Sequence, residues 1–210
     1  DGMYAVFHGD GMDNWIVGKL QGLQRNQVVQ YDDEWRLFAS WIGILSPKLL
    51  AVVSGNHELW SYKIAHLDIV RDALKDVRCL YDKHQVVFDL HLNDARIRHI
   101  VRHKWRYNSV HNPTHGLEVA WDRGDIDYDV AIGGHTHIGT FFREFVRHNK
   151  KRLAVLTGTY KLVDTFAREL GFARPYGKGA GAIIYFPDGK LFHVDDIATA
   201  AALLKSLRKD

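Results

Sequence analysis

The stretch LLAVVSGNHE, residues 49–58, decides how this chain is expected to fold. Its first five residues are continuously apolar, which is the pattern of a short strand covered on both faces. Gly55 then permits a tight turn, and Asn56, His57 and Glu58 follow it. Ligands of open α/β sheets bind beyond the carboxyl ends of the strands. We therefore expect an α/β fold with a functional site at the end of this strand.

Three further predicted strands end in similar polar clusters. They are residues 4–8 followed by Gly9-Asp10-Gly11-Met12-Asp13, residues 96–103 ending in Arg102-His103, and residues 128–132 followed by Gly134-His135-Thr136-His137. Aspartate, asparagine and histidine supply oxygen and nitrogen ligands that suit Mn²⁺, Fe, Zn²⁺ or Ni²⁺. The chain also holds 13 histidines, and histidine is the commonest metal ligand. The four clusters together predict one metal centre.

The spacing within the clusters suggests how they could hold metal. The Asp10 carboxylate can bridge two cations, and the Asn56 amide oxygen is a neutral ligand. His135 and His137 stand two apart in a segment expected to be extended, so both side chains would project to the same side and serve adjacent metals. The glycines before Asp10, Asn56 and His135 would permit close backbone approach.

The remaining pattern predicts a layered sandwich of two mixed sheets flanked by helices. A helix is expected over residues 32–45, capped by Asp32 or Asp33 and stopped by Pro47, with Trp35, Leu37, Phe38, Trp41, Ile42 and Leu45 on its apolar face. Further helices are expected across 64–74, 117–121 and 197–207, and further strands over 85–92, 140–147, 152–156, 182–186 and 190–194, the last two joined by a turn at 187–189.

Composition predicts a single globular domain over residues 1–210. Hydrophobic residues make up 46% and charged residues 25% of the chain. No apolar run approaches the ~20 residues of a membrane helix, and no signal peptide is seen. Cys79 is the only cysteine, which fits a cytoplasmic location. The net charge of +3 permits nucleic acid or a nucleotide as a partner without requiring it, and no oligomeric state is predicted.

The ordered motifs GDGMD (9–13), GNHE (55–58), His103 and GHTH (134–137) resemble the calcineurin-like metallophosphoesterases, in particular phage-type and bacterial ones. GNHE together with GHTH is a specific signal, whereas GDxxD alone is weak. The resemblance spans residues 9–137. It implies a layered α-β-β-α sandwich, hydrolysis of a phosphoester, and two divalent metal ions, with Mn²⁺ the first expectation and Fe, Zn²⁺ or Ni²⁺ the alternatives. It also leaves open that the protein is phage-encoded.

The resemblance further implies a role for each matching residue. Asp10 would bridge both metals, Asn56, His103 and His135 would complete the second metal site, and His137 would serve the first. His57 would act as general acid for the leaving oxygen, with Asp13 orienting it as an Asp–His pair. On physical grounds, two cations about 3.5–4 Å apart can acidify a bridging water to hydroxide and stabilise the phosphoryl charge.

One family feature is missing, the Asp-x-His pair that normally precedes GDxxD and ligates the first metal. Three explanations are open. The favoured one is that the chain begins downstream of a first strand that carries the pair; alternatively His8 substitutes for it, or the first site binds metal weakly. We therefore expect a metal analysis to show one well-occupied site and a poorer one beside His137.

Several residues have competing interpretations. His99, His111 and His115 are rivals of His103, and His115 is the second choice. Glu58 is expected at a helix start or behind the ligands. Trp15, Trp60 and Trp105 could stack on nucleobases or fill the core. The remaining histidines, His66, His84, His91, His148 and His193, are expected to be structural, and residues 147–152 to form a charged hairpin turn.

The sequence favours a phosphodiester as substrate, for a nuclease- or phosphodiesterase-like enzyme. Asn14-Trp15 follows GDxxD where protein Ser/Thr phosphatases have Arg-Gly, which argues against that class. Two alternatives remain open. One is a phosphomonoesterase acting on a small nucleotide or metabolite. The other is a catalytically impaired binding scaffold, for which the missing Asp-x-His pair is the best support.

Overall fold

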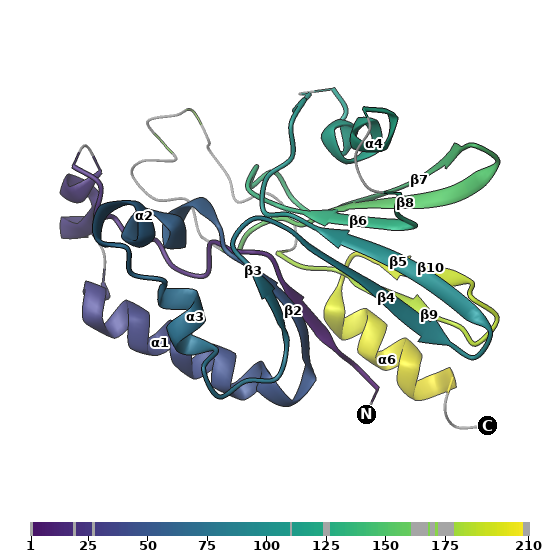
Figure 1. The fold of residues 1–210 in the computed structure, drawn as a ribbon, viewed down its shortest axis with the longest axis horizontal. Helices are drawn as coiled ribbons and strands as arrows, with labels where there is room; N and C mark the ends of the chain where they lie inside the picture. Colours follow the sequence, from purple (N-terminus) through teal and green to yellow (C-terminus); the bar gives the residue numbers. More distant parts are fainter. Residues whose placement is uncertain are drawn as a thin grey trace. The chain divides into compact units, whose positions relative to one another are not determined.

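The computed structural model describes residues 2–18, 20–26, 28–109, 111–123, 127–160, 168, 171 and 179–207. The chain has a mixed α/β structure (Figure 1), as the sequence predicts. It divides into two compact units, which are described separately. The first comprises the residues up to Val86 together with Val101–His103, and the second comprises Val87–Ile100 and the residues from Lys104 onward.

A parallel sheet forms the centre of the first unit. Its strands are β1 (Ala5–Phe7), β2 (Leu49–Val53) and β3 (Leu80–Asp82), in the order β1-β2-β3. The predicted strand 49–53 is confirmed, and its Ala51, Val52 and Val53 are fully buried. Because β1 and β2 run parallel, their carboxyl ends meet at one edge of the sheet. This brings the two polar clusters that follow them together.

Helix α1 (Tyr31–Leu45) confirms the first predicted helix but not its cap. Gln30 occupies the N-cap without a side-chain hydrogen bond, while Asp32 and Asp33 lie in the first turn, where acidic groups favour the helix dipole. Short 3-10 helices, η1 (Gln21–Asn26) and η2 (Ser46–Lys48), flank α1. Pro47 lies in η2 and ends α1 as expected.

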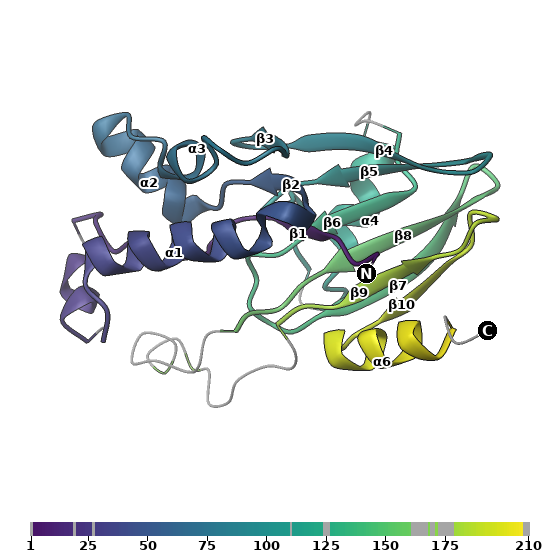
Figure 2. The same ribbon diagram turned by 90° about the horizontal axis from the view of Figure 1, so that it is seen from below.

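Only part of the apolar face predicted for α1 is buried. Phe38 and Ile42 are buried against β2 and α3 (Ile69–Ala73), and Trp35 packs beside them. The views of Figures 1 and 2 agree that α1 and α3 lie side by side. Three members of the predicted face are instead exposed, namely Leu37, Trp41 and Leu45.

The single helix predicted over residues 64–74 is interrupted, so this prediction is confirmed only in part, over Ile69–Ala73. Helix α2 (Asn56–Ala65) begins directly after β2, and α3 follows separately. His66 ends α2 with a left-handed backbone (φ 55°), which a continuous helix cannot accommodate. Asp68 then caps α3 by accepting a hydrogen bond from the main-chain nitrogen of Arg71 (3.0 Å).

The second unit holds a mixed five-stranded sheet in the order β4-β5-β6-β8-β7. Its strands are β4 (Val86–Leu92), β5 (Ala95–Val101), β6 (Val130–Gly133), β7 (Phe141–Arg147) and β8 (Lys150–Leu156). β6 and β8 are parallel, whereas β7 and β8 are antiparallel. The predicted hairpin turn is confirmed, since His148 and Asn149 adopt positive φ between paired Arg147 and Lys150.

The predicted segments near the end of the chain are also confirmed. β9 (Ala182–Tyr185) and β10 (Leu191–Val194) form an antiparallel pair. Between them Gly189 adopts φ +82° and its nitrogen donates to the Phe186 carbonyl. This unit includes the helices α4 (His115–Asp122) and α6 (Ile197–Leu207). No helix in the described ranges combines the length and the apolar character needed to cross a membrane.

Two polar residues of the second unit belong to its interior. Arg152, expected in a charged turn, is buried on β8 and pairs with Asp127 (2.9 Å) and Asp129 (3.0 Å). His99 on β5 is only 2% exposed, stacks on Phe88 and contacts the Tyr185 hydroxyl at 2.6 Å. Burial lowers the pKa of His99 to about 4, so this ring is a neutral core residue.

Candidate metal centre

Two glycines bring the ends of β1 and β2 into close contact. A Cβ atom on Gly9 would collide with the main-chain nitrogen of Gly55, and one on Gly55 would collide with the Asp10 carboxylate. Gly9 has φ +96° and Asp10 itself has φ 56°, a left-handed conformation that is uncommon for a residue other than glycine. The close approach predicted for both glycines is confirmed.

Three potential metal ligands converge at this point. The His103 Nε2 atom lies 3.0 Å from the Asp10 carboxylate and 3.0 Å from the Asn56 amide oxygen. The other ring nitrogen, Nδ1, lies 2.8 Å from the His8 carbonyl oxygen. A carbonyl only accepts, so Nδ1 carries a proton and Nε2 is turned toward two oxygens that also accept.

This arrangement suits a cation. An unprotonated Nε2 beside two acceptor oxygens is unfavourable unless a proton or a metal ion lies among them. Histidine ligands in metalloproteins also commonly donate the second ring nitrogen to a main-chain carbonyl, as His103 does to His8. Asp10, Asn56 and His103 therefore fit a divalent ion in donor type and orientation.

The electrostatics at this point also favour positive charge. Burial alone would raise the pKa of Asp10, but the hydrogen bond and charge of His103, with the charge of His57, hold it at about 2. Burial would lower the pKa of His103, yet its hydrogen bond to Asp10 and the Asp10 charge raise it. Desolvation and the neighbouring His103 charge lower the pKa of His8 to about 4. The His8 carbonyl contacts the His103 ring, the two imidazole rings lie 6.5 Å apart between centroids, and the His8 ring remains a candidate ligand.

Glu58 binds the main chain behind the candidate ligands, which is one of the two positions that the sequence predicts for it. Its buried carboxylate accepts hydrogen bonds from the main-chain nitrogens of Asp10 (3.0 Å), Gly11 (2.7 Å) and Gly55 (2.7 Å). Burial and the nearby Asp10 charge raise the pKa of Glu58. One side chain at the start of α2 thus holds both loops of the site.

His57 is fixed beside the ligands at three of its polar groups. Its main-chain nitrogen donates to the Asp10 carboxylate (3.1 Å), and its carbonyl accepts from the Asn14 amide (2.6 Å). The ring nitrogen Nδ1 lies 2.6 Å from the Asp13 carbonyl oxygen. Nε2 lies 4.0 Å from the Asp10 carboxylate.

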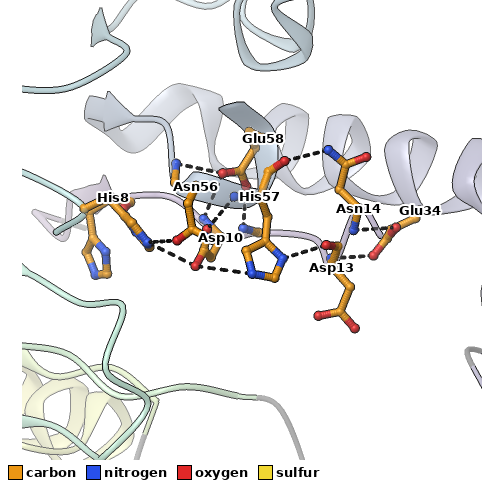
Figure 3. A network of polar contacts seen from close by, with 11 residues as sticks. His8, Asp10, Asp13, Asn14, Glu34, Asn56, His57 and Glu58 are labelled. Atoms are coloured by element: carbon orange, nitrogen blue, oxygen red, sulfur yellow. Dashed lines mark hydrogen bonds and ion pairs between the residues drawn. The ribbon is translucent and has the colours of Figure 1, made fainter. Parts of the chain in front are cut away.

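The contact between Asp13 and His57 differs from the predicted Asp–His pair. Asp13 offers its main-chain carbonyl to the ring, and Figure 3 shows its carboxylate pointing away. The physical reason is that the loop is held by its backbone, because the main-chain nitrogen of Asp13 donates to Glu34 (2.5 Å). Asp13 contacts His57 as predicted, but with its main-chain carbonyl in place of its carboxylate.

The tryptophans near the motifs are mainly core residues. Trp15 is 3% exposed and Trp105 is 4% exposed, and Trp105 donates to the Ile132 carbonyl at 3.1 Å. Neither can offer an open face to a base. Trp60 is half-buried and stacks on the His57 ring with 4.2 Å between centroids, while Trp15 lies tilted against the same ring at 5.1 Å.

His135 and His137 follow β6 in the second unit. His135 is half-buried and His137 exposed. The extended segment expected there is wrong, because both residues have left-handed φ, 74° and 56°, and the alternation of a strand does not apply. His115, the second choice for a ligand, is the first residue of α4, and His111 is exposed. That His135 and His137 meet Asp10 stays a prediction.

Sequence reasoning missed two residues beside the site, Asn14 and Glu34. Asn14 is fully buried with φ 46°, and Glu34 on α1 accepts from the nitrogens of Asp13 and Asn14. Burial raises the pKa of Glu34 against these hydrogen bonds. The only available signal was an asparagine directly after GDxxD, since asparagine tolerates the left-handed region.

The chain matches no protein-family model, and no curated protein is significantly similar to it.

Proposed function

We propose that this protein is a metal-dependent phosphoesterase of the calcineurin-like type, in a layered α-β-β-α sandwich. The observation that carries the proposal is the convergence of Asp10, Asn56 and His103 on one point that favours positive charge. Phosphoesters are anionic, so a cation held there would attract and polarise the substrate.

The proposed ligand set extends to His135 and His137. Asp10, Asn56, His103 and His135 would hold one ion, and Asp10 with His137 would hold the other, with His8 as a further candidate. When bound, two divalent ions, Mn²⁺ first, supply a nucleophile from water and stabilise the charge on the phosphoryl group. Glu58 would keep Asp10 in place through the loop nitrogens it binds.

His57 is the proposed general acid. Because the Asp13 carbonyl only accepts, Nδ1 keeps its proton in both charge states of the ring, and Nε2 is the atom that gains and loses one. Nε2 faces the Asp10 side of the site. A proton donated from there to the leaving oxygen avoids the cost of expelling an alkoxide.

The proposed substrate is a phosphodiester, in a nucleic acid or a nucleotide. The support is the net positive charge of the chain and the half-buried Trp60 beside His57. Hydrolysis of bis(4-nitrophenyl) phosphate and 4-nitrophenyl phosphate should be compared on the Mn²⁺-loaded protein. Turnover of the monoester alone would overturn the choice of a diester, and no turnover by metal-loaded protein would favour a binding scaffold.

Replacing His57 tests the chemistry. We expect His57→Ala to lose roughly 10²–10⁴-fold in turnover of an ester with a poor leaving group. His84→Ala is the matched control, since His84 is exposed on the same unit and its main-chain nitrogen donates to Asp82. Equal activity in both variants would exclude His57 as the acid.

A further inference from the structure

We propose that Asn14 is a positioning residue that sets the orientation of the His57 ring. This inference rests on the proposed function for its catalytic consequence, because His57 is taken to donate the proton to the leaving oxygen. The structural part of the inference does not need that assumption. It concerns how the short segment of Asp13 and Asn14 holds one residue of α2.

The Asn14 amide joins the loop after β1 to both neighbouring helices. Its Nδ2 atom donates to the His57 carbonyl (2.6 Å) and to the Ser61 hydroxyl (2.9 Å) on α2. Its Oδ1 atom accepts from the Trp35 indole nitrogen (3.3 Å) on α1. All the hydrogen-bonding atoms of this fully buried amide are therefore used.

The segment of Asp13 and Asn14 forms hydrogen bonds to His57 at two places. Asn14 binds the main-chain carbonyl of His57, and Asp13 offers its own carbonyl to the ring nitrogen Nδ1 (Figure 3). Glu34 holds the segment from the opposite side through the nitrogens of Asp13 and Asn14. The distance between the His57 backbone and the Asp13 carbonyl is thus fixed by Asn14.

The residue type at position 14 is closely constrained. The backbone is left-handed (φ 46°), which glycine, asparagine and aspartate tolerate best. Two acceptors, the His57 carbonyl and the Ser61 hydroxyl, face Nδ2, so an NH₂ donor is needed. Glycine would keep the backbone and lose the amide, whereas aspartate would keep the shape and lose the donor.

The test combines a structural readout with a catalytic one on the full chain. Long-range ¹H–¹⁵N NMR reports which nitrogen of the neutral His57 ring carries the proton. We expect the Nδ1–H form in the unaltered protein and a mixture of both tautomers in Asn14→Gly. Ser61→Ala removes another partner of the same amide and should keep the Nδ1–H form.

The catalytic readout is the dependence on the leaving group with Mn²⁺ bound. Asn14→Gly should lose on the order of 10–100-fold on methyl phenyl phosphate and far less on methyl 4-nitrophenyl phosphate, whose leaving group needs little acid assistance. A purely structural defect would lower both rates alike. If Asn14→Gly does not fold, Asn14→Asp gives the same comparison.

The outcomes separate the two proposals. A shifted tautomer in the variant, with no ester hydrolysed by the unaltered protein, would retain Asn14 as the positioning residue and reject the phosphoesterase. An unchanged Nδ1–H form in Asn14→Gly and Asn14→Asp, or equal losses on both esters, would reject the role of Asn14.

Discussion

At the scale of single residues, the site depends on how closely two loops can approach. Gly55 lies against Asp10 with no room for a Cβ atom, whereas Gly43 on α1 has open space around it. The two glycines are therefore a matched pair for substitution by alanine. The substitution is expected to be harmful at Gly55 and favourable at Gly43.

We expect Gly55→Ala to abolish high-affinity Mn²⁺ binding, because the added methyl group displaces the Asp10 carboxylate. Gly43→Ala should instead stabilise the protein by about 0.5–1 kcal/mol, since alanine loses less conformational entropy in a helix. Isothermal titration with Mn²⁺ and urea unfolding of both variants measure these effects. Unchanged affinity in Gly55→Ala would contradict the close packing of the two loops.

Glu58 carries the second prediction at this scale. Glu58→Gln replaces one acceptor oxygen by a donor, so at least one of the nitrogens of Asp10, Gly11 and Gly55 loses its partner. A buried unpaired amide costs about 1–3 kcal/mol, and loss of an outer support typically weakens metal binding 10–100-fold. Metal-free urea unfolding and Mn²⁺ titration should both respond. Asp76→Asn, at an exposed position after α3 of the same unit, is the control. Equal results for the two variants would disprove the role of Glu58.

At the scale of elements, most strands were predictable from their apolar runs, although β3 was not predicted, and the boundary between α2 and α3 was missed. Residues 49–53 form a strand because all five side chains are apolar and four of these residues are buried, as expected of a strand covered on both faces. The helix break at His66 depends on a left-handed backbone conformation. Glycine usually indicates such a conformation in a sequence, but this position holds histidine. The exposed Trp41 is a second case in which the sequence is insufficient. An apolar pattern indicates which side chains could be buried, and the tertiary contacts determine which of them are buried.

The candidate site shows the same division between local pattern and three-dimensional contact. The motifs indicated Asp10, Asn56 and His103, because ligands follow strand ends. The use of the Asp13 carbonyl in place of its carboxylate could not be predicted, since it follows from Glu34, which lies 21 residues away and fixes the loop.

Strand β5 gives a prediction for the pH dependence of stability. The pKa of His99 is lowered from 6.5 to about 4 by burial, so the unfolded chain binds a proton in this range and the folded chain does not. Stability therefore falls as the pH drops from about 6.5 to about 4, with a contribution of up to about 3 kcal/mol. Urea unfolding across this range should show a smaller decline for His99→Gln than for the unaltered protein. An identical decline would exclude His99 as a source.

At the scale of the whole molecule, the proposed function requires ligands from both compact units. Asp10, Asn56 and His103 belong to the first unit, and His135 and His137 belong to the second. Metal binding would then stabilise the entire chain, because an ion at 100 times its dissociation constant adds about 2.7 kcal/mol to the folded state. Removing metal with a chelator should lower the unfolding temperature. A protein without a metal centre would unfold at the same temperature with and without the chelator.

The number and strength of bound ions test this requirement most directly. One ion is expected to bind tightly through Asp10, Asn56, His103 and His135, and a second more weakly beside His137, because the second has fewer ligands in this chain. His135→Ala should weaken the tight ion, and His137→Ala should remove the weak one. Elemental analysis after dialysis, with Mn²⁺ titration, separates the two ions. The control is His91→Ala, at an exposed position of β4. If both variants retain the metal content and affinity of the control, the ligands lie elsewhere and the histidines after β6 do not join Asp10.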